Sequence, residues 1–88
     1  MLIVWTKHAQ ERLLQWQYKI NIDKSLIEKI LLNPSQVVSG DLDVFVAQSK
    51  IRNGLIRIPF KKEGETLKIL TIYYTTKVEK YWRNKDEN

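Results

Sequence analysis

The sequence predicts a small two-layer α+β domain with the element order β-α-α-β-β-β-β. Three observations predict this class. The chain has 88 residues, of which 43% are hydrophobic, enough for one core in a single domain spanning residues 1–88. Apolar residues recur at helical spacing in the first third of the chain, and from Gln36 onward they alternate with polar residues at the period of a strand. The turns between these later runs are short, which favours a mostly antiparallel, twisted sheet packed on two N-terminal helices.

The first third of the chain predicts one strand and two helices. Leu2 to Trp5 is a short apolar run with β-branched members, which is typical of a strand. Thr6 is the expected N-cap of the first helix. That helix carries one apolar stripe, made of Ala9, Leu13, Trp16 and Ile20. Residues Ser25 to Glu28 predict a capping box that opens a second helix, and Asn33-Pro34 ends it.

The rest of the chain predicts four strands. They are expected at Gln36–Ser39, Val44–Lys50, Leu55–Phe60 and Thr66–Thr75. Turns are expected at Gly40-Asp41, at Asn53-Gly54 and at Glu63 to Glu65. Because residues 67–74 are apolar on both faces over much of their length, this run is predicted to be the central strand. A helical turn or two is expected within residues 77–83, before a frayed tail at residues 84–88.

Composition excludes several classes of protein. The chain has no cysteine and one histidine, so a disulfide framework, a thiolate metal site and a histidine metal site are excluded, and no metal or cofactor is expected. No apolar run approaches the ~18 residues of a membrane span, which predicts a soluble cytoplasmic protein with no membrane partner. The net charge of +5 favours a polyanion or an acidic protein as partner.

The only histidine lies near the start of the first predicted helix. His8 and Arg12 are four residues apart, so they share one polar edge of that helix. An imidazole can transfer a proton, and a guanidinium beside helix N-terminal amides can hold an anion. These are parts of a phosphoryl-transfer site that needs no metal. The same spacing also suits an ordinary solvated helix face, and the two interpretations stay open at this point.

Further basic and hydroxyl residues lie on the predicted strands. Alternation turns Arg57 away from Ile56 and Ile58, toward an open concave face if the helices cover the other side. A row of cations there would hold a nucleic-acid backbone, and the candidates are Lys50, Arg52 and Arg57. Solubilising charges on an exposed strand face would look the same. Around the end of the last strand, candidates for contacts to phosphate, ribose or base are Thr71, Thr75, Lys77 and Tyr81.

The combination resembles a family of small prokaryotic domains of unknown function with a His-Ala-x-x-Arg-like first helix. The resemblance rests on Lys7-His8-Ala9 with Arg12, on Asn33-Pro34 before Val37-Val38, and on the segment from Leu70 to Lys77 followed by Lys80-Tyr81. These domains look like relatives of RelE-type toxins in the barnase, EndoU, colicin and RelE ribonuclease group. The family often has Arg-Gly-Ile after the first helix, where this chain has residues 17–20, Gln-Tyr-Lys-Ile.

The resemblance implies a RelE-like fold and a toxin-type, metal-independent endoribonuclease, in which the ribose 2′-hydroxyl attacks the adjacent phosphate. It implies that His8 is the general acid or base, that Arg12 stabilises the phosphate charge and that Lys77 completes the anion site. RNA, free or ribosome-associated, and a cognate antitoxin protein are the partners it implies. The alternative is a non-catalytic RNA-binding or protein-interaction module on the same fold. A third possibility is a small structural or regulatory domain without a nucleic-acid ligand.

Overall fold

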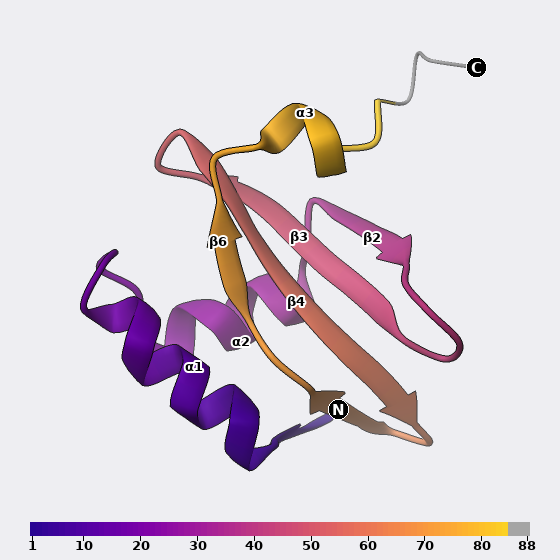
Figure 1. Ribbon diagram of the computed structural model, residues 1–88. Coiled ribbons are helices and arrows are strands. Elements are labelled where there is room, and N and C mark those ends of the chain that lie inside the picture. The colour runs from indigo at the N-terminus through magenta and orange to yellow at the C-terminus, as the bar shows by residue number, and fades with distance from the viewer. Residues whose placement is uncertain (85–88) are drawn as a thin grey trace.

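The computed structural model describes residues 1–84, in which one six-stranded sheet is accompanied by three helices (Figure 1). The elements are β1 (Leu2–Trp5), α1 (Lys7–Gln17), α2 (Lys24–Leu32), β2 (Gln36–Ser39), β3 (Phe45–Ile51), β4 (Gly54–Glu63), β5 (Thr66–Ile69), β6 (Tyr73–Thr75) and α3 (Val78–Tyr81). The α+β class and the order of the first six elements are therefore as predicted. Apart from Asn84, the predicted frayed tail lies outside the described residues.

The sheet is mostly antiparallel, as predicted. Its strand order is β1-β5-β4-β3-β2, and β6 also pairs with β4. One pair is parallel: β1 lies beside β5, with Leu2 opposite Thr66 and Trp5 opposite Ile69. A strand from the last third of the chain thus pairs with β1.

The central strand is β4, and the prediction of one long central strand from Thr66 to Thr75 is wrong. The structure divides that run between β5, which pairs with the end of β4, and β6, which pairs with its beginning. The interruption falls at Pro59, which has no N–H to donate to a ladder. Between the two ladders, residues 70–72 face residues 58 and 59, and Leu70 N donates to Pro59 O at 2.9 Å. The extra residue bends the chain like a β-bulge and re-aims β6.

Helix α1 begins where the sequence predicts. Thr6 Oγ1 accepts from Ala9 N at 3.1 Å and donates to Leu70 O at 3.0 Å, so this side chain caps α1 and ties it to the sheet. The helix ends at Gln17, earlier than the apolar stripe suggested. Ile20, the last member of the stripe, still packs against the core from the turn that follows.

Helix α2 is capped by Asp23, and the predicted capping box at Ser25 is wrong. Asp23 Oδ1 accepts from Leu26 N at 2.8 Å, and Ser25 lies inside the first turn. A carboxylate supplies the acceptor that the free amides require, so the helix begins before the serine. The end at Leu32, with Asn33 as C-cap, is as predicted.

The turn between β3 and β4 also differs from the prediction by one residue. Ile51 pairs with Gly54, so the two-residue turn is Arg52-Asn53 instead of Asn53-Gly54. Both turn residues have positive φ, 50° and 63°, as a type I′ hairpin turn requires. Gly54 belongs to β4, where the Tyr74 ring and Thr75 O leave no space for a Cβ.

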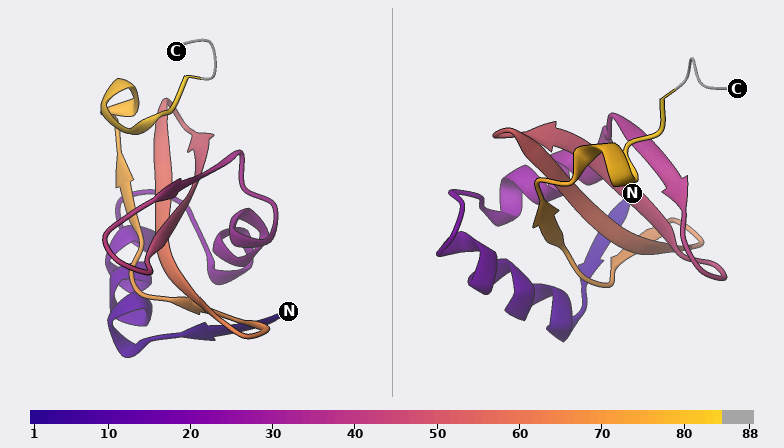
Figure 2. Two further views of the ribbon diagram at one scale, coloured as in Figure 1. Left: turned by 90° about the vertical axis from the view of Figure 1, so that its right-hand side faces the viewer. Right: turned by 45° about the horizontal axis from the view of Figure 1, so that its top comes forward.

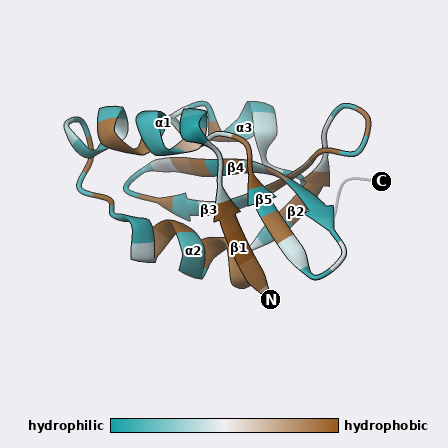
Figure 3. Cartoon of the chain, turned by 90° about the horizontal axis from the view of Figure 1, so that it is seen from below, coloured by the Kyte–Doolittle hydropathy of each residue, from teal (hydrophilic) through white to brown (hydrophobic). Residues whose placement is uncertain are grey.

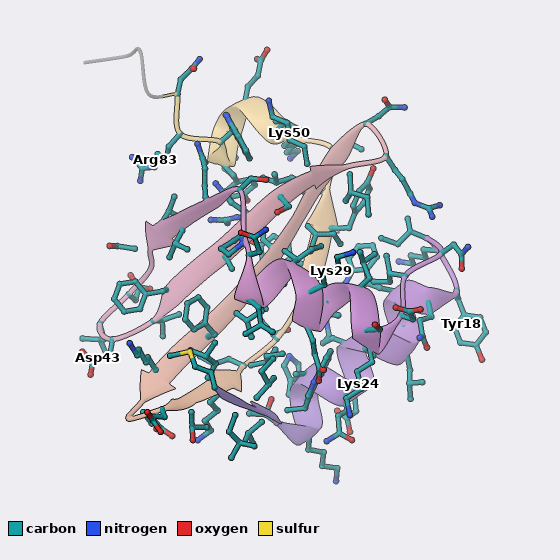
Figure 4. The ribbon with its side chains drawn as sticks, turned by 180° about the vertical axis from the view of Figure 1, so that it is seen from behind. Tyr18, Lys24, Lys29, Asp43, Lys50 and Arg83 are labelled. Carbon is teal, nitrogen blue, oxygen red and sulfur yellow. The ribbon has the colours of Figure 1, made fainter. Side chains whose placement is uncertain are left out.

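Both long helices bury side chains in one core. Helix α1 lies alongside β6, and α2 lies across the back of β3 (Figures 1 and 4). Hydrophobic and hydrophilic positions alternate along both helices (Figure 3). The buried cluster contains Ala9, Leu13, Ile22, Ile27, Ile30, Leu31, Ala47, Ile56, Ile58, Phe60, Leu67, Ile69 and Ile72. Helix α3 lies on the opposite side of the sheet from α2 (Figure 2), so it stands over the face that the core does not use.

Candidate nucleic-acid interface

The sheet face opposite α2 carries a buried arginine. Strand alternation points Ile56 and Ile58 into the core and Arg57 to the other side, as predicted. The expectation that this face is open is wrong at Arg57, whose side chain is only 8% exposed. The chain that follows β6 turns back as α3 and covers it, and the centre of the Tyr81 ring lies 4.1 Å from the guanidinium carbon.

The guanidinium of Arg57 is held by neutral groups. Its Nε donates to Gln48 Oε1 at 2.9 Å, and one Nη donates to the hydroxyl of Tyr73. The rings of Tyr73 and Tyr81 meet edge to face, with centroids 6.3 Å apart, and both lie near the guanidinium. An arginine has five N–H donors, and these described contacts engage two of them.

Two glutamines connect this arginine to the C-terminal segment. Gln48 is fully buried, and its Nε2 donates to Gln36 Oε1 at 2.8 Å and to Tyr81 O at 3.1 Å. Gln36 in turn bonds the backbone of Arg83. Gln36, Gln48 and Tyr73 are not among the site residues that the sequence predicts.

Arg57 forms part of the wall of a pocket of 450 Å³ beside α3. The lining residues are Val38, Ser39, Arg57, Glu79, Lys80, Tyr81, Trp82, Arg83 and Asn84. Three of them are cations and one is an acid, so the pocket favours an anion. Lys50 does not line this pocket, but its Nζ lies 4.4 Å from the centre of the ring of Trp82, which does. Figure 4 shows Lys50 and Arg83 at the same end of the molecule.

The other predicted binding residues lie in the β3–β4 turn and along the chain from β5 to the start of α3. Arg52 is in the β3–β4 turn and donates to Asn21 O at 3.1 Å, so its guanidinium is directed toward the α1–α2 connection. A second pocket, of 430 Å³, is lined by Lys50, Arg52 and Val78 among others. Thr75 Oγ1 accepts from Lys77 N at 3.0 Å at the end of β6, while Thr71 lies in the segment between β5 and β6.

The structure does not bring His8 and Lys77 together. Helix α1 starts beside Leu70, which accepts from Thr6, whereas Lys77 follows the far end of β6. The intervening extended chain spans about 20 Å. Lys77 lines a third pocket, of 450 Å³, together with Lys80. Neither His8 nor Lys77 lines the pocket of Arg57.

His8 and Arg12 lie on the outer side of α1. His8 is exposed, and Arg12 is half-buried, donating to Gln15 Oε1 at 2.9 Å with its guanidinium carbon 6.0 Å from the centre of the Trp16 ring. They share one helix edge, as predicted, but the described contacts of Arg12 are to its own helix. The catalytic role assigned to this pair stays a prediction.

Within residues 1–84, no group of three or more His, Cys, Asp or Glu side chains could hold a metal ion. None of the helices in the same range is long and apolar enough to cross a membrane.

Comparison of the chain with protein-family models, with curated proteins and with solved structures finds no match in any of the three. The resemblance to RelE-type toxins therefore stays a prediction.

Proposed function

We propose that this protein is a metal-independent endoribonuclease whose scissile phosphate sits in the pocket beside Arg57. One observation carries the proposal: a guanidinium with 8% exposure lines an anion-favouring pocket, and both hydrogen-bond partners described for it are neutral. A buried charge is costly unless it is paired. A bound phosphate would supply the missing negative charge through charge-assisted hydrogen bonds.

The chemistry follows from the charge that develops on the phosphate. The ribose 2′-hydroxyl loses a proton to a base and attacks the adjacent phosphorus, and the 5′-oxygen leaves with a proton. The products are a 2′,3′-cyclic phosphate end and a 5′-hydroxyl end. Arg57 would stabilise the extra negative charge on the phosphate oxygens in the transition state. Glu79, the carboxylate among the residues that line the pocket, is our candidate for the base that takes the 2′-hydroxyl proton and returns it to the leaving 5′-oxygen.

The aromatic residues beside the pocket favour single-stranded RNA as the substrate class. Tyr81 and Trp82 both line the pocket, and aromatic rings bind unstacked bases of any sequence. Lys50, Lys80 and Arg83 add positive charge for the neighbouring phosphates. DNA has no 2′-hydroxyl, so it would bind without being cut.

The partners and the compartment belong to the same proposal. An antitoxin with an acidic segment would silence such an enzyme by covering the basic pocket, and a ribosome would present mRNA to it. Cellular RNA as substrate implies a cytoplasmic protein. These statements rest on the positive charge around the pocket and on the family resemblance.

A second function, RNA binding without cleavage, is favoured by one specific observation. The single imidazole of the chain lies on α1 and does not line the pocket of Arg57. A binding module would keep the salt-dependent affinity for RNA and produce no fragments.

The deciding experiment incubates the protein with single-stranded RNA in EDTA and identifies the fragment ends. We expect cyclic phosphate ends from the parent protein and a loss of cutting with Arg57→Met. The matched control is Lys29→Met, which removes one charge from α2 on the far side of the sheet (Figure 4). Arg57→Lys, which keeps the charge, guards against a folding defect, and thermal unfolding checks all variants. If the wild-type protein binds the RNA but leaves it intact, the protein is the binding module. If Arg57→Met binds RNA as tightly as wild type, this pocket is excluded as the binding site.

A further inference from the structure

The carboxamide of Gln48 makes three hydrogen bonds in the interior of the protein. Its oxygen accepts from Arg57 Nε at 2.9 Å. Its nitrogen donates to Gln36 Oε1 at 2.8 Å and to Tyr81 O at 3.1 Å. The side chain is 0% exposed, so water does not substitute for any of these partners.

These contacts allow only one orientation of the Gln48 amide. Both acceptors, Gln36 Oε1 and Tyr81 O, lie on the side of the amide nitrogen. Rotating the amide by 180° would place its NH₂ group against the N–H of Arg57, donor against donor, and its oxygen against two acceptors. Gln36 and the backbone of Tyr81 therefore determine which atom of Gln48 faces Arg57.

Gln36 is fixed by the chain that follows α3. Its Oε1 accepts from Arg83 N at 3.0 Å, and its Nε2 donates to Arg83 O. One side-chain amide thus satisfies both backbone groups of Arg83, as a neighbouring strand would do. The result is a continuous relay of hydrogen bonds from Arg83 through Gln36 and Gln48 to Arg57.

We propose that Gln48 is a positioning residue for Arg57, and that Gln36 and the backbone of residues 81–83 set its orientation. The inference rests on the proposed phosphate site and adds that the C-terminal segment is part of that site. With Nε held by Gln48 and one Nη held by Tyr73, the plane of the guanidinium is fixed. A preorganised donor gains affinity because less freedom is lost when the anion binds.

The test replaces Gln36 by leucine, because Gln36 belongs to the relay and its described hydrogen bonds do not include Arg57. The first readout is the rate at which the Arg57 Nε–H exchanges with solvent, which NMR measures on protein with ¹⁵N-labelled arginine. The second is the Kd for a fluorescent single-stranded RNA. Gln48→Leu breaks the relay directly, and Gln17→Leu, on the exposed end of α1, is the matched control.

We expect slow Nε–H exchange in the parent and in Gln17→Leu, and exchange at least about tenfold faster in both relay variants. We also expect their Kd for RNA to rise by about threefold or more at equal thermal stability. Unchanged exchange in Gln36→Leu would overturn the inference, as would weaker RNA binding without faster exchange. If exchange accelerates as expected but Arg57→Met binds RNA like wild type, the relay is supported and the proposed function fails.

Discussion

Arg57 and Gln48 face each other across β3 and β4 and are joined by a 2.9 Å hydrogen bond, with 8% and 0% of their surfaces exposed. A polar pair buried this deeply in a chain of 88 residues stabilises the fold only if its buried donors and acceptors are satisfied. Among the described residues, no buried side-chain nitrogen or oxygen lacks a partner. The buried amide of Gln48 is therefore fully paired, whereas the charge of Arg57 and its three remaining N–H donors are open to a ligand.

The proton transfer can be assigned by comparing Glu79 with His8. Glu79 lines the pocket of Arg57 and His8 does not, so we expect Glu79→Gln to slow RNA cleavage by about 100-fold. His8→Ala should change the rate by less than about threefold, since removing a general acid or base normally costs far more. Single-turnover cleavage with labelled RNA measures both. The reverse result would return the proton transfer to His8, as the family resemblance implies.

Lys50 should contribute one phosphate contact. Its Nζ lies over the ring of Trp82, which lines the pocket of Arg57. We expect Lys50→Ala to reduce the slope of log Kd against log salt concentration by about 0.7, the value for one phosphate of a single strand. Lys29→Ala, on α2, should leave the slope unchanged. Fluorescence anisotropy at four or more salt concentrations gives the slopes, and equal slopes for Lys50→Ala and wild type would exclude Lys50 from the RNA path.

Thr6 should matter more than an ordinary helix cap. Its hydroxyl caps α1 and also donates to Leu70 O, so Thr6→Ala removes two hydrogen bonds. We expect a loss of about 1.5 kcal/mol in the free energy of unfolding. Urea denaturation measures it, with Thr76→Ala, an exposed threonine in the β6–α3 connection, as the control. A loss equal to that of the control would show that neither bond contributes.

Gly54 should not tolerate alanine. A Cβ there would lie 2.7 Å from Thr75 O and closer still to the ring of Tyr74. We expect Gly54→Ala to destabilise the protein by about 1 to 3 kcal/mol, because β6 must move away from β4. Gly64→Ala tests the opposite case: it has open space but a φ of +63°, so its cost is backbone strain alone. Thermal unfolding in which Gly54→Ala matches wild type would contradict the close β4–β6 approach.

Arg52 occupies a backbone conformation that suits asparagine better. Its φ of 50° begins the type I′ turn. We expect Arg52→Asn to stabilise the protein by about 0.5 kcal/mol, despite losing the exposed bond to Asn21 O. Arg52→Val should destabilise it, because a β-branched side chain resists positive φ. Opposite shifts in Tm for the two variants are the expected outcome, and shifts of the same sign would contradict this turn geometry.

Strand alternation was sufficient to place Arg57 on the face opposite Ile56 and Ile58, but the identity of its partner depended on the hairpin register. A turn at Asn53-Gly54 would have set Lys50 across from Arg57, two like charges on one face. The observed turn at Arg52-Asn53 moves the register and sets Gln48 there instead. Since a two-residue shift leaves every side chain on the same face, the hydrophobic pattern could not distinguish the two.

The features that the sequence did not predict depend on contacts between residues far apart in the chain. The covering of Arg57 by Tyr81 depends on how β6 directs the chain into α3, and the split at Pro59 sets that direction. Local patterns report which face a residue occupies and where a helix begins, as they did for Thr6. Local patterns do not indicate which distant segment of the chain packs over a strand.

The parallel pairing of β1 with β5 has a consequence for biosynthesis. Leu2 and its partner Thr66 are 64 residues apart in the chain, so β1 is synthesised well before the strand with which it pairs. At about 5 to 20 residues per second, this interval is about 3 to 13 s. During that time the apolar segment from Leu2 to Trp5 has no ladder to join, and it is exposed to any binder of nascent chains.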